Sequence, residues 1–406
     1  MLRTKLLVGV LIGVLVGVLV VAEPVKVVFW HAMGKHLGET IDALVQKFNQ
    51  ENEGVIEVEA VYQGGYGSLE QKLFGAVATG EPPTIVQQYE DVTIQMLDAL
   101  VPLEDYISPD LMQDIFPNLV EMNVFDGKMY TVPFNKSIIV LYYRPDLVPE
   151  PPTTWEEYLA KSCELTVDED GDGTPERYGT GLRYTPELFF TFLAQNEGAV
   201  ISEDGEILIN NQAGLETAQF LSELAKCALV QSAYFSQGAL QDGLVAMFLQ
   251  TSAGYKYNIP AAETGGYTLK VATVPCHKTC ASMIQGTNLA VFSMNQTEDQ
   301  IAAAVKFIEF LLRPDNIVFW AKETGYLPIT YSAINSEEWQ TFVADNPDRA
   351  AMVAQFQHGV GVPHHPAWAD IRSLFYTYNE MLYTGELSPQ DYVSELAAEI
   401  QAILEQ

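Results

Sequence analysis

The pattern of apolar and polar positions predicts alternating strands and helices at the start of the chain. The segments VKVVFWH (25–31), IEVEAVY (56–62) and TIVQQYE (84–90) have the composition and spacing of strands. Residues 37–54 and 68–78 place apolar side chains at helical spacing between these strands. This order of elements is typical of a doubly wound α/β sheet.

Open sheets of this kind bind ligands beyond the carboxyl ends of their strands. Three segments follow the three predicted strands directly: residues 31–34, residues 63–67, and the adjacent acids Glu90 and Asp91. We therefore expect these segments to share one edge of the sheet.

The later part of the chain predicts a second lobe. Residues 126–147 have the pattern of extended chain leaving the first lobe, and LKVATVP (269–275) reads as a strand of the second. NLAVFSM (288–294) then reads as a strand that returns to the first lobe, before helices around 300–323. We expect residues 23–134 plus about 287–337 in one lobe, and about 135–286 plus 338–406 in the other.

The N-terminus predicts export. Residues 6–22 form an unbroken apolar run after two basic residues, and small residues precede Glu23. This fits a cleavable signal peptide over residues 1–22, with a membrane anchor as the alternative. We therefore expect a periplasmic or other extracytoplasmic protein.

Composition narrows the class of partner. The 406 residues are 48% hydrophobic, which is ample for two packed domains. The net charge of −32 argues against nucleic acid, because binding there needs a basic surface. The same charge argues against docking on anionic lipid.

Four cysteines are present, and Cys276 and Cys280 lie close together in PCHKTC. Export permits a disulfide between them. Free thiols, or a metal site that includes His277, are the alternatives that stay open.

Enzymatic motifs are scarce. The chain has no GxxxxGK[ST], HExxH, GxSxG or GxGxxG sequence. His358, His364 and His365, with Asp370, offer a metal-binding alternative, and Glu90 with Asp91 offers an acid pair of the kind used by glycosidases. Exposed polar loops and adjacent acids in a chain with 53 carboxylates are the simpler interpretations.

The segment DEDGDGTPE (168–176) has the spacing of an oxygen-ligand loop for calcium, with a glycine at the sharp turn. We expect a structural calcium site there, and an acidic surface turn is the alternative. The predicted ligands are Asp168, Asp170, Asp172, Thr174 and Glu176.

Several motifs resemble a known family, in the same order along nearly the whole mature chain. They are FWHAMGKHLGETIDALVQKFNQ, VYQGGYGSLEQKL, ATGEPPTIVQQYE, VPFNKSIIVLYY, PPTTWEEYL and KETGYLPIT. The chain resembles the periplasmic solute-binding components of ABC importers, in the extracellular sugar-binding class and its glycerol-3-phosphate-binding branch. The resemblance implies a type II periplasmic binding protein fold, with two α/β lobes, hinge strands and a ligand cleft between the lobes.

The resemblance also implies which residues bind the ligand. Arg372 would supply a fork of donors to phosphate oxygens, and Glu90 would accept hydrogen bonds from hydroxyls. Lys136 replaces a serine of the family motif and would add a cation near the phosphate, while Tyr184 stands where the family has a larger tryptophan. The full predicted set is Tyr66, Glu90, Lys136, Ser137, Tyr184, Thr251, Gly286, Tyr326 and Arg372.

The function that the resemblance implies is capture of glycerol-3-phosphate or a glycerophosphodiester such as glycerophosphocholine, and delivery to a membrane permease. A neutral sugar or oligosaccharide is the alternative ligand. A secreted glycosidase or phosphodiesterase is the alternative from another class. We expect a monomer that is not an enzyme and needs no cofactor beyond the calcium considered above.

Overall fold

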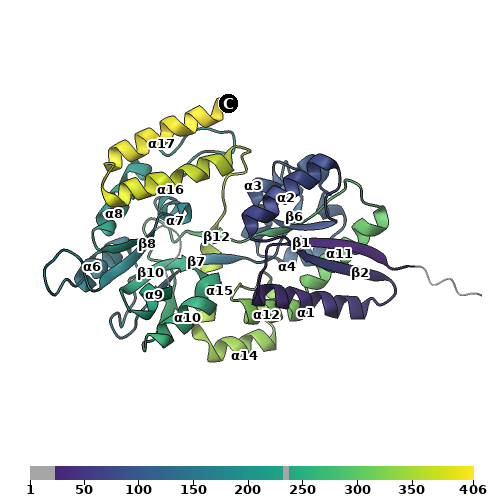
Figure 1. Ribbon diagram of the computed structural model, residues 1–406, viewed down its shortest axis with the longest axis horizontal. Helices are drawn as coiled ribbons and strands as arrows, with labels where there is room; N and C mark the ends of the chain where they lie inside the picture. The colour runs from purple at the N-terminus through teal and green to yellow at the C-terminus, as the bar shows by residue number, and fades with distance from the viewer. Residues whose placement is uncertain (1–22, 232–236) are drawn as a thin grey trace, which may run out of the picture.

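The computed structural model describes residues 23–231 and 237–406 as two α/β lobes, each built on its own sheet (Figure 1). The predicted signal segment, residues 1–22, lies outside the described residues. Among the residues that are described, no helix has the length and apolar character needed to cross a bilayer. The two-lobed α/β organisation predicted from the sequence is confirmed.

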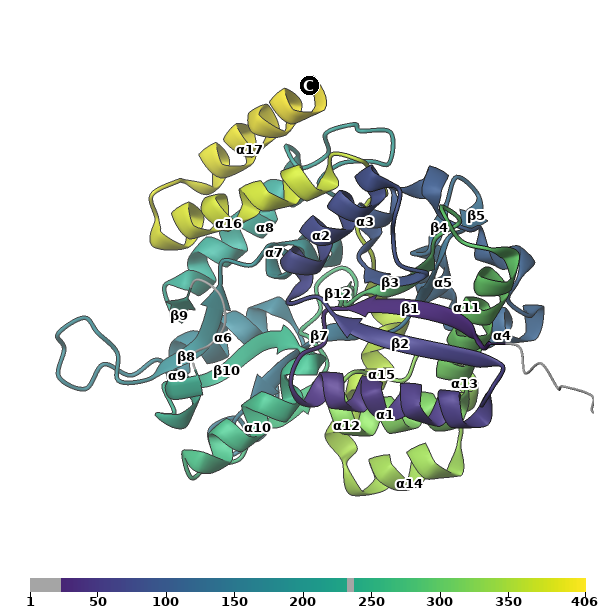
Figure 2. The same ribbon diagram turned by 45° about the vertical axis from the view of Figure 1, so that its right-hand side comes forward.

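The first lobe is built on a five-stranded sheet in the order β2-β1-β3-β13-β6. β1 runs parallel to β2 and β3, whereas β13 is antiparallel to both of its neighbours, β3 and β6. Helices α1 and α2 lie on opposite sides of this sheet (Figure 2). The elements are β1 (Val25–His31), α1 (His36–Glu51), β2 (Ile56–Tyr62), α2 (Tyr66–Thr79), β3 (Ile85–Gln88), α3 (Glu90–Thr93), η1 (Leu97–Ala99), η2 (Leu103–Asp105), α4 (Pro109–Asp114), α5 (Pro117–Glu121), β4 (Val124–Phe125), β5 (Lys128–Met129), β6 (Thr131–Pro133), β13 (Asn288–Val291), α11 (Glu298–Leu311), α12 (Pro314–Thr324) and α13 (Tyr331–Ile334).

The second lobe is built on a sheet in the order β14-β12-β7-β10-β8-β9, with β11 also paired to β7. The long strand β7 is antiparallel to β10, β11 and β12. The elements are β7 (Ser137–Tyr143), α6 (Trp155–Leu165), β8 (Tyr178–Arg183), α7 (Pro186–Gln195), α8 (Gln212–Ala225), β9 (Ala228–Gln231), α9 (Gln237–Gln241), β10 (Val245–Thr251), η3 (Ser252–Gly254), α10 (Tyr255–Thr264), β11 (Lys270–Ala272), β12 (Ser282–Gln285), α14 (Glu337–Asp345), α15 (Pro347–Gln355), η4 (Phe356–His358), β14 (Gly359–Val360), α16 (Trp368–Thr384) and α17 (Pro389–Leu404).

Alternation along β7 divides the hydrophobic interior into two cores. Ile138 and Tyr142 point to one face of the second sheet and join a core that continues into the first lobe. Ile139 and Leu141 point to the other face, where α6, α7, α8, α16 and α17 cover a separate core. The first core therefore extends across the junction between the lobes.

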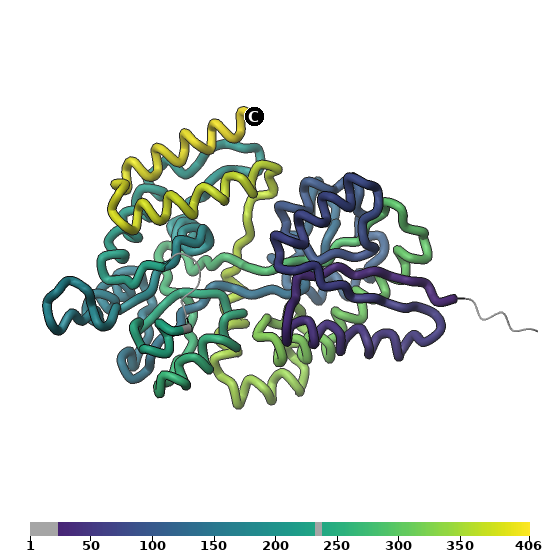
Figure 3. The backbone as a smooth tube through the Cα atoms, in the orientation of Figure 1, coloured from purple at the N-terminus to yellow at the C-terminus, as the bar shows by residue number. Residues whose placement is uncertain are grey.

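Two short crossings connect the sheets and form the hinge. Residues 134–136 lead from β6 to β7, and residues 286–287 lead from β12 to β13; both run between the lobes in Figure 3. Asn135 ties the crossings together, because its Oδ1 accepts hydrogen bonds from the amide and the hydroxyl of Thr287, at 3.3 and 2.5 Å. The same oxygen accepts from Gln87 in β3 at 2.8 Å.

The later elements follow the sequence pattern. NLAVFSM supplies β13 of the first sheet and LKVATVP contains β11 of the second. Gly325 ends α12 in the left-handed conformation, with φ of 86°. The exact residue limits of the two lobes stay a prediction.

All four cysteines are paired in two disulfides, Cys163–Cys227 and Cys276–Cys280. The second pair was one of three alternatives left open by the sequence. Free thiols and a metal site with His277 were the wrong alternatives, because both sulfurs are already bonded to each other.

Candidate ligand-binding site

Two adjoining cavities lie between the lobes, where the hinge meets the carboxyl ends of β2 and β3. One has a volume of about 350 Å³ and the other about 290 Å³. They share four lining residues and so form neighbouring parts of one cleft: Tyr66, Tyr89, Gln285 and Gly286.

We name the two parts by their lining. The uncharged cavity is the larger; among the residues that the structure describes, no charged side chain lines it, and its remaining residues are Ser137, Gln250, Thr251, Ala253, Gly254, Tyr257, Asn258 and Tyr326. The acidic cavity is the smaller, and its remaining residues are Gly67, Glu70, Glu90, Asp91, Glu187, Ile284, Val362, Trp368, Ala369 and Arg372.

Most of the predicted ligand residues meet in this cleft, although their roles toward a ligand stay predictions. Lys136 and Tyr184 are not among the lining residues of either cavity. The seven that line it are Tyr66, Glu90, Ser137, Thr251, Gly286, Tyr326 and Arg372.

Tyrosine rings form the wall between the two cavities. Tyr66 packs on Tyr89 with ring centroids 4.9 Å apart, and its hydroxyl lies 3.5 Å from that of Tyr326. Asn135 donates a hydrogen bond to the Tyr66 hydroxyl at 2.8 Å. Burial, followed by the neighbouring Tyr326, raises the pKa of Tyr66 well above its usual range. Tyr66 therefore presents a neutral hydroxyl, and the three rings present apolar faces.

Lys136 lies below the cleft rather than in it. Its Nζ is 2.8 Å from Oε1 of Glu90 and donates to the carbonyl of Gly286 at 3.2 Å. Burial alone would raise the pKa of Glu90, but Lys136 and the hydrogen bond from Asn288 outweigh it and lower that pKa. The placement of Lys136 as a cation beside a bound phosphate has no support in this geometry, because Lys136 is the counter-ion of Glu90.

Arg372 lines the acidic cavity but is also paired. Its Nε donates to Oε1 of Glu187 at 2.9 Å, and Nη2 bonds the same oxygen. Nη2 is also 3.3 Å from the hydroxyl of Tyr376. Burial would lower the pKa of Arg372, but Glu187 outweighs it and raises that pKa, so the guanidinium stays charged and held by a carboxylate.

The acidic cavity contains a second carboxyl with a shifted pKa. Burial, followed by the charge of Glu90, raises the pKa of Asp91 to about 6, while Arg372 lowers it. Burial also raises the pKa of Glu70. With Glu187, four carboxyl groups line this cavity, against one guanidinium in its wall and the ammonium of Lys136 beneath it.

Hydroxyl and amide groups line the uncharged cavity. Thr251 donates to the hydroxyl of Ser137 at 2.6 Å, at the end of the antiparallel pair β7 and β10. Gly286 has φ of 100°, and a Cβ there would lie 1.9 Å from the carbonyl oxygen of Asn135. Glycine is therefore required where the two hinge crossings touch.

Tyr184 lies in the second lobe, at the end of β8. Its ring centroid is 6.3 Å from that of Tyr383, and its carbonyl accepts a hydrogen bond from Asn379 at 3.0 Å. Its predicted place beside the ligand has no geometric support among the residues that line the two cavities.

The sequence did not predict several of the lining residues, among them Tyr89, Glu187 and Gln285. Tyr89 stands inside the QQYED motif that identified Glu90, so the motif itself carried the signal. Glu187 lies in the first turn of α7, three residues after Tyr184, and Gln285 directly precedes Gly286. Neither has a sequence signal of its own, because both meet the cleft through tertiary packing.

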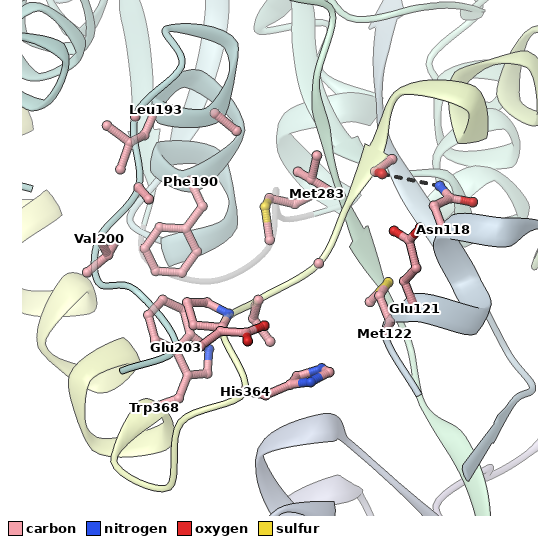
Figure 4. Close-up of a pocket in the computed structure, with 18 residues that line it drawn as sticks. Asn118, Glu121, Met122, Phe190, Leu193, Val200, Glu203, Met283, His364 and Trp368 are labelled. Carbon is pink, nitrogen blue, oxygen red and sulfur yellow. Dashed lines mark hydrogen bonds between the residues drawn. The ribbon is translucent and has the colours of Figure 1, made fainter. Parts of the chain in front are cut away.

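A third cavity, of about 460 Å³, lies between α5 and α7 (Figure 4). Figure 4 shows Met122 of the first lobe across from Phe190 and Met283 of the second. His364 stacks on Phe125 there, at a centroid distance of 4.3 Å. Stacking and packing therefore account for this histidine without a metal.

The two predicted metal-binding groups, the acidic loop and the histidine cluster, differ in whether their side chains come close enough to share an ion. In the described chain, the group of side chains close enough to share an ion is Asp168, Asp170 and Glu176, whose oxygens lie within 4.8 Å of one another. His358, His364, His365 and Asp370 form no such group within that part of the chain. His365 Nδ1 instead accepts from the Ala367 amide at 3.1 Å.

Comparisons with known proteins agree with this architecture. The family model described as bacterial extracellular solute-binding protein matches residues 43–351. The sn-glycerol-3-phosphate-binding periplasmic protein UgpB of Shigella flexneri is 28% identical, over 89% of this chain and 88% of that protein.

Two solved structures are similar in fold. The cyclic alpha-maltosyl-1,6-maltose binding protein of Arthrobacter globiformis has a TM-score of 0.81 and 23% identity, over 94% of this chain and 99% of that one. UgpB from Mycobacterium tuberculosis, in complex with glycerophosphocholine, has a TM-score of 0.78 and 19% identity, over 95% and 99%. With its family match and two lobes around a cleft, this chain belongs to the bacterial extracellular solute-binding proteins, the ligand-capturing components of ABC importers.

Proposed function

We propose that this protein captures a neutral, polyhydroxylated solute, such as a sugar or short oligosaccharide, and delivers it to a membrane permease. Closure of the two lobes about residues 134–136 and 286–287 would enclose the ligand. The ligand would favour the closed state by contacting both lobes at once.

The observation that carries this proposal is the charge of the cleft. Lys136 and Arg372 are each paired with a carboxylate, Glu90 and Glu187. An anionic group at Arg372 would have to share the guanidinium with Glu187 and lie near the ionised Asp91. A neutral ligand avoids this repulsion.

The remaining chemistry suits hydroxyl groups. Ser137, Thr251 and the amides of Gln250, Asn258 and Gln285 line the uncharged cavity. Each can donate and accept hydrogen bonds, as sugar hydroxyls do. The rings of Tyr66, Tyr89 and Tyr326 add apolar faces on which the carbon skeleton of a sugar can pack.

The second candidate is the one that the sequence favoured, glycerol-3-phosphate or a glycerophosphodiester. Its support is the 28% identity to a protein named for binding sn-glycerol-3-phosphate. The side chain of Arg372 is 34% exposed, so a ligand could reach it. On this reading Glu187 would have to give up part of its contact with Arg372.

Three further expectations stay part of the proposal. We propose that the mature protein acts outside the cytoplasm after export, as its family does. We propose that it is a monomer that does not convert its ligand, so incubation with a bound ligand should yield no new product. We also propose that Asp168, Asp170 and Glu176, whose oxygens lie within 4.8 Å of one another, hold a structural calcium ion, with Asp172 and Thr174 as the further ligands that the sequence predicts.

The test of the ligand class is a thermal-shift screen of the mature protein, followed by calorimetric titration of each ligand that stabilises it. The panel contains neutral mono-, di- and trisaccharides, sn-glycerol-3-phosphate and glycerophosphocholine. Stabilisation by a neutral saccharide alone supports the proposal, and stabilisation by the phosphate esters alone supports the second candidate.

A further inference from the structure

A buried arginine outside the cleft holds the turn that carries Tyr326. Arg349, near the start of α15, is 1% exposed. Its Nη1 donates to the carbonyl of Gly325 at 3.0 Å, and its Nη2 donates to the carbonyls of Ala321 and Tyr326 at 3.0 and 2.7 Å. The partners of this guanidinium are thus carbonyl oxygens at the end of α12.

The electrostatics of this contact have a clear cause. Burial lowers the pKa of Arg349 to about 10, because removal from water disfavours the charged form of the guanidinium. The carbonyl end of a helix carries partial negative charge, so α12 offsets part of the cost of burying this cation. Tyr255 and Trp339 add ring faces near the guanidinium, at 5.6 and 6.0 Å.

The three bonds fix one residue in particular. The carbonyls of Gly325 and Tyr326 stand on either side of the Tyr326 Cα, so holding both restricts the rotation that would redirect its ring. The amide of Leu327 donates to the carbonyl of Lys136 in the hinge at 3.0 Å. The ring itself stacks on Trp320, with centroids 5.7 Å apart, and lines the uncharged cavity.

Arg349 reaches this turn from the other lobe. The amide of Val271 in β11 donates to Asp348 at 3.3 Å, and the amide of Val274 donates to Gln355 at 3.1 Å. These bonds fasten both ends of α15 to the second lobe. Helix α12 instead packs against α1 and α11 of the first lobe.

We infer that Arg349 is a positioning residue for ligand binding, which sets the direction of Tyr326 from the second lobe by clamping the carbonyls on both sides of it. The inference rests on the proposed site insofar as Tyr326 contacts the ligand. Arg349 itself touches neither cavity.

The first test does not depend on a ligand. Arg349→Lys keeps the charge, but one ammonium cannot reproduce the planar fork that reaches three carbonyls. We expect amide hydrogen exchange in residues 321–328 to accelerate about tenfold or more. Exchange in β7 and β10 should stay as in the unchanged protein. If residues 321–328 exchange at the same rate in Arg349→Lys as in the unchanged protein, the proposed clamp is wrong.

The second test asks whether Arg349 acts through Tyr326. Maltotriose is the probe, titrated by calorimetry into the unchanged protein, Arg349→Lys, Tyr326→Ala and the double variant. We expect Arg349→Lys to weaken binding about tenfold alone, and less than about twofold when Tyr326 is already alanine. If Arg349→Lys lowers the maltotriose affinity by the same factor with tyrosine and with alanine at position 326, Arg349 does not act through Tyr326.

Arg313→Lys is the matched control, because Arg313 lies at the opposite end of α12 and pairs with Glu51 and Asp315 on the surface. It should change neither exchange nor affinity. Should Arg349→Lys fail to fold, Arg349→Gln is measured in its place. Should maltotriose fail to bind the unchanged protein, that result counts against the proposed ligand, and the exchange experiment still decides the clamp.

Discussion

The ammonium of Lys136, which is buried beneath the cleft, lies 2.8 Å from the carboxylate of Glu90, which lines the acidic cavity and is itself almost wholly buried. Asn288 donates to the same carboxylate oxygen at 2.9 Å. In this geometry Lys136 is the counter-ion of Glu90, so its predicted role beside a phosphate has no support from these contacts. The pairing also leaves the acidic cavity with an excess of carboxylates, which is the basis for a neutral ligand.

Removal of Lys136 should therefore damage stability. Lys136→Met leaves Glu90 buried without its counter-ion, and we expect a loss of about 3–5 kcal/mol in the free energy of unfolding. Urea denaturation measures it. The double variant Lys136→Met/Glu90→Gln should recover part of the loss. Lys322→Met, at an exposed pair with Glu338, is the control and should cost less than about 1 kcal/mol. Equal losses at the two lysines would contradict the buried pair.

Glu187 should control the selectivity of the cleft for charge. Glu187→Gln removes the carboxylate that holds Arg372, and it frees the guanidinium for an anion. We expect the affinity for sn-glycerol-3-phosphate to rise about tenfold, as measured by calorimetry. Glu216→Gln, outside the cavities, should leave it unchanged. An unchanged phosphate affinity in Glu187→Gln would show that Glu187 does not exclude anions.

Asp91 should make stability depend on pH. Its pKa in the folded protein is about 6, above the ordinary value of 3.8, so the folded state holds this proton more tightly. The resulting stability is fully present below pH 3.8 and is lost as the pH rises through 6. We expect Asp91→Asn to be more stable than the unchanged protein by about 1–2 kcal/mol at pH 8, with little difference at pH 4. Denaturation at both pH values measures this, and a constant difference would contradict the pKa assignment.

The loop 168–176 should bind calcium, and the bound ion should stabilise the folded protein. Within it, Asp168 accepts hydrogen bonds from the amides of Gly171 and Gly173, at 2.8 and 3.0 Å, so the loop is already folded. We expect millimolar calcium to raise the unfolding temperature and EDTA to reverse it. The variant Asp170→Asn/Glu176→Gln should abolish the response. No shift in the unchanged protein would identify the loop as an acidic surface turn.

Much of the fold was predictable because local signals agreed with it. The strand pattern of residues 25–31 and the stop at Gly325 each depend on nearby residues alone. The location of Tyr66, Glu90 and Tyr326 was predictable because their motifs align without gaps. These are the parts of the chain where sequence spacing and tertiary position coincide.

The side-chain pairing was not predictable in the same way. Lys136 and Glu90 are 46 positions apart, and Arg372 and Glu187 are 185 apart, so nothing local indicates that these charges neutralise each other. Arg349 was missed for the same reason, since its partners lie on another helix. The net charge of the cleft could therefore be determined only from the folded structure, in which these groups lie together.

The central claim, that the cleft takes a neutral polyhydroxylated ligand, is tested most directly by calorimetric titration of the mature protein. The saccharide that most stabilises it in the thermal screen is compared with sn-glycerol-3-phosphate and glycerophosphocholine at the same salt concentration. The account predicts saturable binding of the saccharide, and binding of glycerol-3-phosphate that is weaker by about a hundredfold or more. Tight binding of glycerol-3-phosphate, with no saccharide bound, would contradict it.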